Sequence, residues 1–469
     1  MRTTHSLSIT FLMLLTATGC SKRGADSTVV VIVLDALHAA HVSHLGYDRE
    51  TTPHLDRLAA EGITFTQAVA PAPYTLATMA SLHTGLLPDA HGITQGRRRL
   101  SDERRTIATH LAEHGWRSFG ATGNLNASSL QGLHRGFERF LEMHRPAPSR
   151  DRAGALGDVA ESETDLRASG ATPPLAEEFP PVVDEWLAAL GSSKAFLFPH
   201  LLEPHSPYRA PEEIKRRFVD EAYEGPFANG ATRPFLQSVR GELEVSPTDI
   251  AAGIGQYDAN LAYADAALGE IFERLRAAGR YDDALIIVTS DHGEAFWQHG
   301  RWGHNDELHE ETVHVPLVVK LPAGRSIAGR RVDGLVSPMD LLPSLCEWLE
   351  LPVPDGLHGV PLQRAIDGNT EAAQRKLVLR NHDEVPKLAL RADGLKLLMT
   401  STGRELYDLS TDPEERRPLS VDDHPQGVVM LRFLERFESV RAGWEGAAAE
   451  GAELTPEEER LLEELGYLK

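Results

Sequence analysis

Four stretches of the chain are continuously apolar and rich in β-branched residues. They cover residues 27–37 (STVVVIVLDAL), 194–202 (KAFLFPHLL), 283–293 (DALIIVTSDHG) and 313–320 (VHVPLVVK). Such runs are typical of strands buried on both faces of a parallel sheet. Helical patterns lie between them, at 53–62, 102–115 and 256–279. This alternation predicts an α/β fold, a three-layer sandwich with a mainly parallel central sheet.

The pattern changes near residue 371. Short apolar runs separated by turn residues follow, at 376–381, 387–394, 395–403 and 405–409. They predict a small C-terminal antiparallel sheet. Thr455, Pro456 and Glu458 form a capping signal for a last helix. We therefore expect a catalytic α/β domain over 27–370 and an α+β subdomain over 371–469. Residues 145–180 lack periodicity and predict a surface excursion.

The first 20 residues predict an export signal. An apolar run too short to span a membrane follows Arg2, and small residues lead to Cys20. The sequence TATGC resembles a bacterial lipoprotein processing site, with Ala17 where leucine is more usual. We expect an exported protein of the cell envelope, periplasmic or on the outer surface, held to the membrane by a lipid on Cys20. The alternative is plain secretion without the lipid. Cys346 lies in an apolar helical stretch and is interpreted as a buried thiol.

The overall charge narrows the range of partners. The 469 residues include 47 Lys and Arg against 69 Asp and Glu, a formal net charge of −22. This excess of negative charge argues against nucleic acid as a partner and against membrane binding through bulk charge.

Aspartate and histidine side chains, which can bind metal ions, follow the ends of three predicted strands. Asp35 closes the first strand, His200 and His205 follow the second, and Asp291 with His292 closes the third. The carboxyl ends of parallel strands meet at one sheet edge. Either aspartate alone could be a helix cap, but two carboxylates and an imidazole together indicate a divalent metal site, for calcium, manganese or zinc.

Thr75 gives this site a candidate nucleophile. In APYTLATMASLHTG it precedes an apolar-periodic run that ends at Gly85, which predicts a short helix with Thr75 as its N-cap. A helix N-terminus favours a tetrahedral oxyanion, and a metal ion touching the hydroxyl would lower its pKa. The combination predicts transfer of a phosphoryl or sulfuryl group to Thr75, followed by hydrolysis.

Four segments, in this order, resemble the sulfatase family of the alkaline phosphatase superfamily. They are 31–93, 196–208 (FLFPHLLEPHSPY), 286–319 and 405–415 (ELYDLSTDPEE). The resemblance runs from about residue 28 to the C-terminus, apart from 145–180 and roughly 210–250. It implies an alkaline phosphatase-like fold and a hydrolase of sulfuric or phosphoric esters.

The resemblance also assigns residues to roles. It places Asp35, Thr75, Asp291 and His292 on metal-binding positions, Thr75 being the nucleophile as well. His205, in EPHSPY, matches a histidine that contacts the anionic oxygens of the substrate. His304, in WGHNDEL, lies near another such position. Among the 21 histidines, His200, His299 and His314 are interpreted as structural or supporting.

Three departures from the family pattern change the expected mechanism. Most sulfatases carry a Cys or Ser that is oxidised to formylglycine, which Thr75 cannot become, because a secondary alcohol oxidises to a ketone. Met79 stands where an arginine assists the nucleophile, and Ala36 stands where many sulfatases have a further metal-binding aspartate. In these respects the chain is similar to the one-metal threonine enzymes of the superfamily, such as the lipoteichoic acid synthases.

These observations predict a metal-dependent hydrolase that cleaves sulfate or phosphate esters through a covalent Thr75 intermediate. One alternative is a phosphodiesterase or phosphoglycerol-type transferase of the cell envelope. Another is a catalytically silent binding protein on the same fold, which Ala36 and Met79 would favour. The expected substrate is an anionic ester of a glycan, a lipid or a small molecule.

Overall fold

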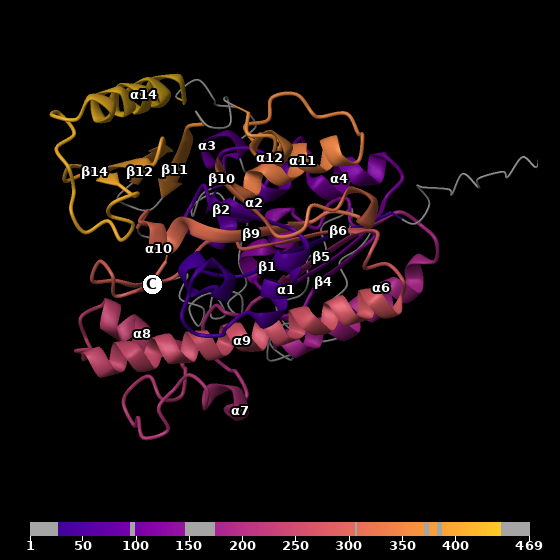
Figure 1. Cartoon of the computed structure of the whole chain (residues 1–469), viewed down its shortest axis with the longest axis horizontal. Helices are drawn as coiled ribbons and strands as arrows, with labels where there is room; N and C mark the ends of the chain where they lie inside the picture. The colour runs from indigo at the N-terminus through magenta and orange to yellow at the C-terminus, as the bar shows by residue number, and fades with distance from the viewer. Residues whose placement is uncertain are drawn as a thin grey trace, which may run out of the picture.

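An eight-stranded sheet forms the centre of the molecule (Figure 1). The computed structural model describes residues 27–93, 99–145, 174–304, 307–369, 375–381 and 387–441. The strand order is β10-β2-β9-β6-β1-β5-β3-β4. The bounds are β1 Thr28–Leu34, β2 Ile63–Val69, β3 Arg117–Thr122, β4 Arg139–Glu142, β5 Ala195–Leu201, β6 Ala284–Thr289, β9 His314–Lys320 and β10 Arg330–Val336. Among these eight described strands only β9 runs antiparallel to its neighbours, so the predicted mainly parallel sheet is confirmed.

The four apolar runs form β1, β5, β6 and β9, whereas β2, β3, β4 and β10 were not predicted. Polar residues explain two of the omissions. In β2 the polar Thr64, Thr66 and Gln67 interrupt the apolar pattern, and the edge strand β10 begins with two exposed arginines. In β3 the glycine is required by packing, because a Cβ on Gly120 would lie 2.8 Å from the Phe140 ring.

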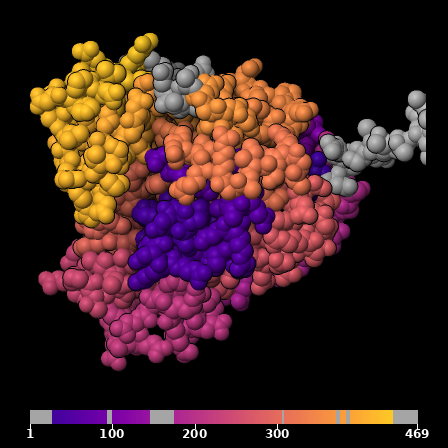
Figure 2. Space-filling model, in the orientation of Figure 1, coloured from indigo at the N-terminus to yellow at the C-terminus, as the bar shows by residue number. Residues whose placement is uncertain are grey.

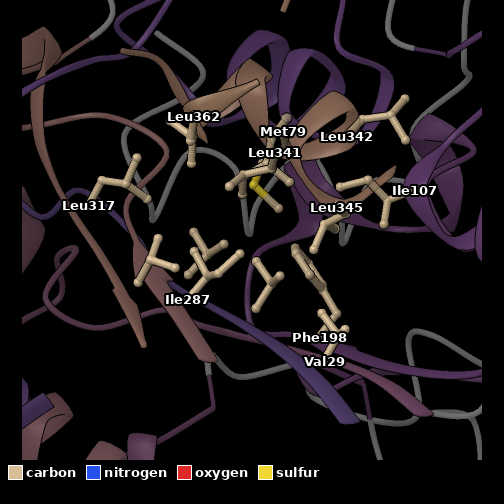
Figure 3. Close-up of a cluster of buried hydrophobic side chains, with 14 of the residues drawn as sticks. Val29, Met79, Ile107, Phe198, Ile287, Leu317, Leu341, Leu342, Leu345 and Leu362 are labelled. Carbon is tan, nitrogen blue, oxygen red and sulfur yellow. The ribbon is translucent and has the colours of Figure 1, made fainter. Parts of the chain in front are cut away.

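Helices cover both faces of the sheet, as the sandwich prediction requires (Figure 1). One face packs against α2 Thr75–Thr84, α4 Ile107–Glu113, α11 Leu341–Trp348 and α12 Leu362–Ile366. The other face packs against α1 Pro53–Glu61, α6 Phe179–Leu190 and α9 Pro247–Ala277. Alternate β1 side chains enter the two cores: Val29, Val31 and Val33 enter the first, and the residues between them enter the second. Figure 3 shows the first core, where Met79, Ile287 and Leu345 lie between α2, α11 and the strands.

Two helices begin at different residues from those predicted, and capping explains both. The helix expected at 102–115 starts at Ile107, because Thr106 and Thr109 form a capping box. The helix expected at 256–279 starts nine residues earlier, where Ser246 accepts a hydrogen bond from the backbone of Asp249 and Pro247 occupies the first helical position.

The C-terminal antiparallel sheet is confirmed. It has the order β11-β12-β13-β14, with bounds Leu377–Asn381, Lys387–Ala392, Leu395–Met399 and Arg404–Asp408. Helix α14 Pro425–Arg441 packs on one face through Met430 and Leu434. On the surface this part forms the yellow lobe at the upper left of Figure 2. The helix predicted from Thr455 lies outside the described residues.

Shorter elements connect these layers. They are α3 Pro88–His91, α7 Glu212–Lys215, α8 Thr232–Val239, α10 Glu310–Val313, β7 Ala295–Phe296 and β8 Trp302–Gly303. Cys346 is buried in α11, as expected for a structural thiol. None of the helices in the described ranges is long and apolar enough to cross a membrane. The export signal and Cys20 lie outside the described residues, as does most of the excursion at 145–180. Export and lipid attachment therefore stay proposals.

Candidate active site

The predicted site residues meet at the carboxyl edge of two neighbouring strands. Asp35 directly follows β1, and Asp291 and His292 follow β6, which pairs with β1 in parallel. Thr75 approaches the same edge as the first residue of α2. The solvent exposure of each of these four residues is 0%.

The start of α2 differs from the prediction in one detail. Tyr74, with extended backbone angles, is the N-cap, and Thr75 is the first helical residue. Thr75 is therefore not the N-cap that the sequence suggested. Its Oγ1 lies 3.1 Å from Nε2 of His292. The predicted end of the helix is correct, since Gly85 adopts a left-handed φ of 69° and its N–H caps the last turn.

Backbone contacts fix the orientation of His292. Its Nδ1 lies 2.8 Å from the carbonyl oxygen of Gly293. A carbonyl can only accept a hydrogen bond, so Nδ1 carries a proton and the neutral ring presents a lone pair at Nε2. The hydroxyl of Thr75 donates toward that lone pair.

Two carboxylates face the same nitrogen. Oδ1 of Asp35 lies 3.6 Å and Oδ2 of Asp291 lies 3.4 Å from Nε2 of His292. Neither of these buried oxygens has a hydrogen-bond partner among the described residues. Oδ1 of Asp291 accepts from the backbone N–H groups of Ala36 and His292, at 3.1 and 2.9 Å. A lone pair and two unbonded carboxylate oxygens converge on one place, which is the donor set that a divalent cation requires.

The pKa shifts agree with this electrostatic picture. Burial raises the pKa of Asp35 above its usual range, and the charge of Asp291 raises it further. Burial acts in the same direction on Asp291, but His292 and His200 outweigh it and hold its pKa below the usual range. Burial also lowers the pKa of His292. The two carboxyl groups therefore repel each other, and a cation between them would relieve that repulsion.

The two other predicted catalytic residues line the same site. The ring of His304 lies 4.2 Å from that of His292 and 5.0 Å from that of His205, measured between centroids. Asn260 holds the His205 loop by donating to the carbonyl oxygens of Pro204 and His205, both at 3.2 Å. Burial, and then the charge of His304, lower the pKa of His205 to about 4. His205 is therefore a neutral imidazole near pH 7.

Three residues of the site were not predicted from the sequence: Asn124 and Glu294 were not identified, and His200 was interpreted as structural or supporting. Asn124, just after β3, donates to Oδ2 of Asp35 at 2.6 Å and to Oγ1 of Thr75 at 3.4 Å. Oε1 of Glu294 lies 3.0 Å from Nδ1 of His304. His200 lies 3.3 Å from Oδ2 of Asp35. Recognition of β3 would have placed Asn124 at the same sheet edge, whereas no local signal separates His200 from the other histidines.

The remaining histidines and the positions that depart from the family pattern lie in structural surroundings. His299 contacts Glu311 and the carbonyl of Glu415, and Nε2 of His314 lies 3.0 Å from the carbonyl oxygen of Thr66. Met79 is part of the apolar core. Ala36 has a left-handed φ of 60°, and its N–H supports Asp291.

Comparisons with known proteins agree with this architecture. A profile described as Sulfatase matches residues 27–351, and one described as N-sulphoglucosamine sulphohydrolase, C-terminal, matches residues 297–442. The Ulvan-active sulfatase of Formosa agariphila is 24% identical over 425 residues, which cover 83% of this chain and 76% of that protein.

Solved structures share the fold. The putative sulfatase yidJ from Bacteroides fragilis aligns with a TM-score of 0.70 at 18% identity, over 91% of this chain and 98% of that one. The phosphonate monoester hydrolase of Agrobacterium radiobacter aligns with a TM-score of 0.65 at 23% identity, over 89% of this chain and 96% of that one.

Sulfatases generally use a divalent metal ion, and Asp35, His200 and Asp291 form a group that could hold one. Because the Sulfatase profile covers most of the chain, from β1 through α11, this protein belongs to the sulfatase family and is a hydrolase of sulfate or phosphate esters.

Proposed function

We propose that the protein cleaves sulfate or phosphate esters in a metal-dependent reaction that passes through a covalent ester on Thr75. The observation that carries the proposal is the position of the Thr75 hydroxyl, 3.1 Å from Nε2 of His292 at the start of α2. In the first step a bond forms between Oγ1 and the sulfur or phosphorus, the bond to the ester oxygen breaks, and the alcohol leaves with a proton. In the second step water cleaves the threonine ester, which restores the hydroxyl and releases sulfate or phosphate.

Asp35, Thr75, Asp291 and His292 are the residues that would hold the metal ion. When bound, a divalent ion lowers the pKa of a coordinated hydroxyl and neutralises anionic substrate oxygens. Asn124 supports Asp35 and Thr75 together, because its amide donates to both. The first N–H groups of α2 have no partner within the helix and favour an anion at this end.

His205 and His304 are proposed to bind the anionic oxygens of the substrate. The ring of His304 lies between those of His292 and His205. Nδ1 of His205 faces the carbonyl oxygen of Ser206 and Nδ1 of His304 faces Glu294, so each ring donates to a substrate oxygen through Nε2 when it is protonated, a form that a bound anion stabilises. Such donors contribute most when negative charge grows in the transition state. The name of the Formosa relative associates that protein with ulvan. For this chain we propose an anionic ester carried by a glycan, a lipid or a small molecule.

A panel of chromogenic esters tests the proposal. The purified protein is assayed with p-nitrophenyl phosphate, bis-p-nitrophenyl phosphate and p-nitrophenyl sulfate, before and after chelation and after the return of calcium, manganese or zinc. We expect turnover of at least one ester, loss of turnover on chelation, and recovery with one of the ions. No turnover and no bound metal would favour a binding protein on the same fold.

Substitution of His205 by alanine should slow turnover about 10²-fold, corresponding to roughly 2 to 4 kcal/mol of lost transition-state stabilisation. The effect should fall mainly on kcat, because the contact strengthens as charge develops. His314→Ala is a suitable control, since that histidine contacts the carbonyl of Thr66 instead of the site. An unchanged kcat in the His205 variant would return His205 to a structural role.

A further inference from the structure

His200 lies beside the two carboxylates, although its sequence context gives no sign of this position. It is the sixth residue of β5, which pairs in parallel with β1, and its solvent exposure is 0%. Its Nε2 lies 3.3 Å from Oδ2 of Asp35. One ligand atom from each of Asp35, His200 and Asp291 falls within 4.8 Å of the others. Donors bound to one ion at about 2.0–2.6 Å lie up to about 5 Å apart, so these three side chains can share an ion.

The hydrogen bonds behind the ring determine which nitrogen carries the proton. Thr122 has one hydroxyl proton, which it donates to the carbonyl oxygen of Asn124 at 3.1 Å. The Thr122 oxygen must then accept from Nδ1 of His200, at 2.9 Å. The neutral ring therefore presents its lone pair at Nε2, on the side of the carboxylates.

This lone pair has no hydrogen-bond partner among the described residues, in spite of its short distance to Asp35. A nitrogen lone pair facing a buried carboxylate oxygen is repulsive unless a proton or a metal cation lies between them, and one divalent ion would satisfy His200 and both carboxylates at once. His292 presents its Nε2 to Asp35 and Asp291 in the same way, with its Nδ1 fixed by Gly293. The two histidines thus approach one pair of carboxylates, each held from behind through Nδ1.

We propose that Nε2 of His200 is an additional ligand of the active-site metal ion, so that two imidazoles and two carboxylates bind it together with the hydroxyl of Thr75. This inference rests on the ion site of the proposed function and adds both a ligand and a class of metal. Two nitrogen donors suit zinc or another late first-row ion, whereas calcium prefers oxygen donors alone. The site is therefore selective for a transition metal over calcium, and His200 is the source of part of that selectivity.

Metal binding tests the proposal without any measurement of turnover. Dissociation constants for Zn²⁺ and Ca²⁺ are measured by competition with a chelating dye for the wild type and for His200→Ala, Thr122→Val and His314→Ala. His314 is a control, because its Nε2 contacts the carbonyl oxygen of Thr66 and it lies outside the groups of described residues that could hold a metal ion. We expect His200→Ala to weaken Zn²⁺ binding by more than about 100-fold. Thr122→Val should weaken it by about 10-fold, because Thr122 only orients the ring of the ligand through Nδ1. Binding of Ca²⁺ should change by less than about 3-fold, because calcium gains little from imidazole.

Proton NMR of the Co²⁺-substituted protein counts the imidazole ligands directly. Each of the two histidines should contribute one solvent-exchangeable, paramagnetically shifted Nδ1–H resonance, because His200 donates to Thr122 and His292 donates to Gly293. We expect two such resonances in the wild type and one in His200→Ala, with His314→Ala unchanged. A single resonance in the wild type would overturn the proposal even if a variant failed to fold. Equal losses of Zn²⁺ and Ca²⁺ affinity in His200→Ala would also overturn it. Absence of ester turnover with two resonances present would refute the proposed function and leave the His200 ligand standing.

Discussion

Replacement of Thr75 by alanine should lower kcat/KM by at least about 10⁴-fold, because the variant has no oxygen that can attack the ester. In the structure the hydroxyl is 3.1 Å from Nε2 of His292 and 3.4 Å from Nδ2 of Asn124. Alanine keeps the helix and removes only this reacting group. The rate of ester hydrolysis is measured under chelated and metal-loaded conditions.

The loss of activity should not come from unfolding. Tyr74 is the N-cap of α2, so alanine at position 75 removes no cap and has the best helix propensity. Two buried hydrogen bonds are lost, to His292 and Asn124, which together cost about 1–3 kcal/mol. Denaturant unfolding of the variant should therefore stay within that range of the wild type.

Thr78→Ala is a matched control for this experiment. Thr78 lies one turn further along α2, is equally buried, and donates to the carbonyl oxygen of Ala72 at 3.0 Å. Its replacement costs a similar hydrogen bond and should leave turnover nearly unchanged. Thr75→Ser keeps a hydroxyl and should retain part of the activity, with a sulfuryl or phosphoryl adduct on residue 75 detectable by mass spectrometry after rapid quenching. Activity of Thr75→Ala near that of the wild type would exclude a threonine ester.

The sequence predicts the centre of the fold well and its edges poorly. In β1 all seven residues are buried, since both faces are covered by helices, and a continuous apolar run reports this directly. β10 is an edge strand with an exposed start, and β3 contains a glycine that makes room for the Phe140 ring, so neither shows the pattern. An apolar run also carries no information on strand direction, so the antiparallel orientation of β9 could not be predicted.

The residues of the candidate site also fall into two groups, those that the sequence predicts and those that it does not. Asp35 and Asp291 follow the two most clearly apolar strands, and the sheet edge brings them together. Asn124 depends on β3, whose position was not predicted. His200 is within β5, and only the hydrogen bond of its Nδ1 to Thr122 shows which nitrogen faces Asp35. Such details depend on pairs far apart in sequence, which local patterns do not report.

Replacement of Asp291 by asparagine should remove ion binding while it changes the stability of the metal-free protein little. Asparagine keeps an oxygen that can accept from the N–H groups of Ala36 and His292, as Oδ1 of the aspartate does. The new amide nitrogen takes the place of Oδ2 and can donate to Nε2 of His292, 3.4 Å away. The repulsion between Asp291 and the buried Asp35 disappears, but so does the favourable interaction with His292 and His200 that holds the pKa of Asp291 below its usual range. The two effects oppose each other, so the metal-free variant should be about as stable as the metal-free wild type.

The same change should remove the response to metal. An ion present at about 100 times its dissociation constant stabilises the wild type by about 2.7 kcal/mol, whereas the variant, with one ligand charge fewer, should gain almost nothing. Turnover should fall at least about 10³-fold, because substrate and nucleophile both depend on the ion. Thermal unfolding with and without Zn²⁺, Mn²⁺ or Ca²⁺ measures the first effect, and the ester assay measures the second. Asp265→Asn is the control, since that buried carboxylate binds the N–H groups of His54 and Leu55 at the start of α1. That variant should lose stability but keep its metal-dependent gain, whereas an undiminished gain in Asp291→Asn would show that the ion does not bind at this carboxylate.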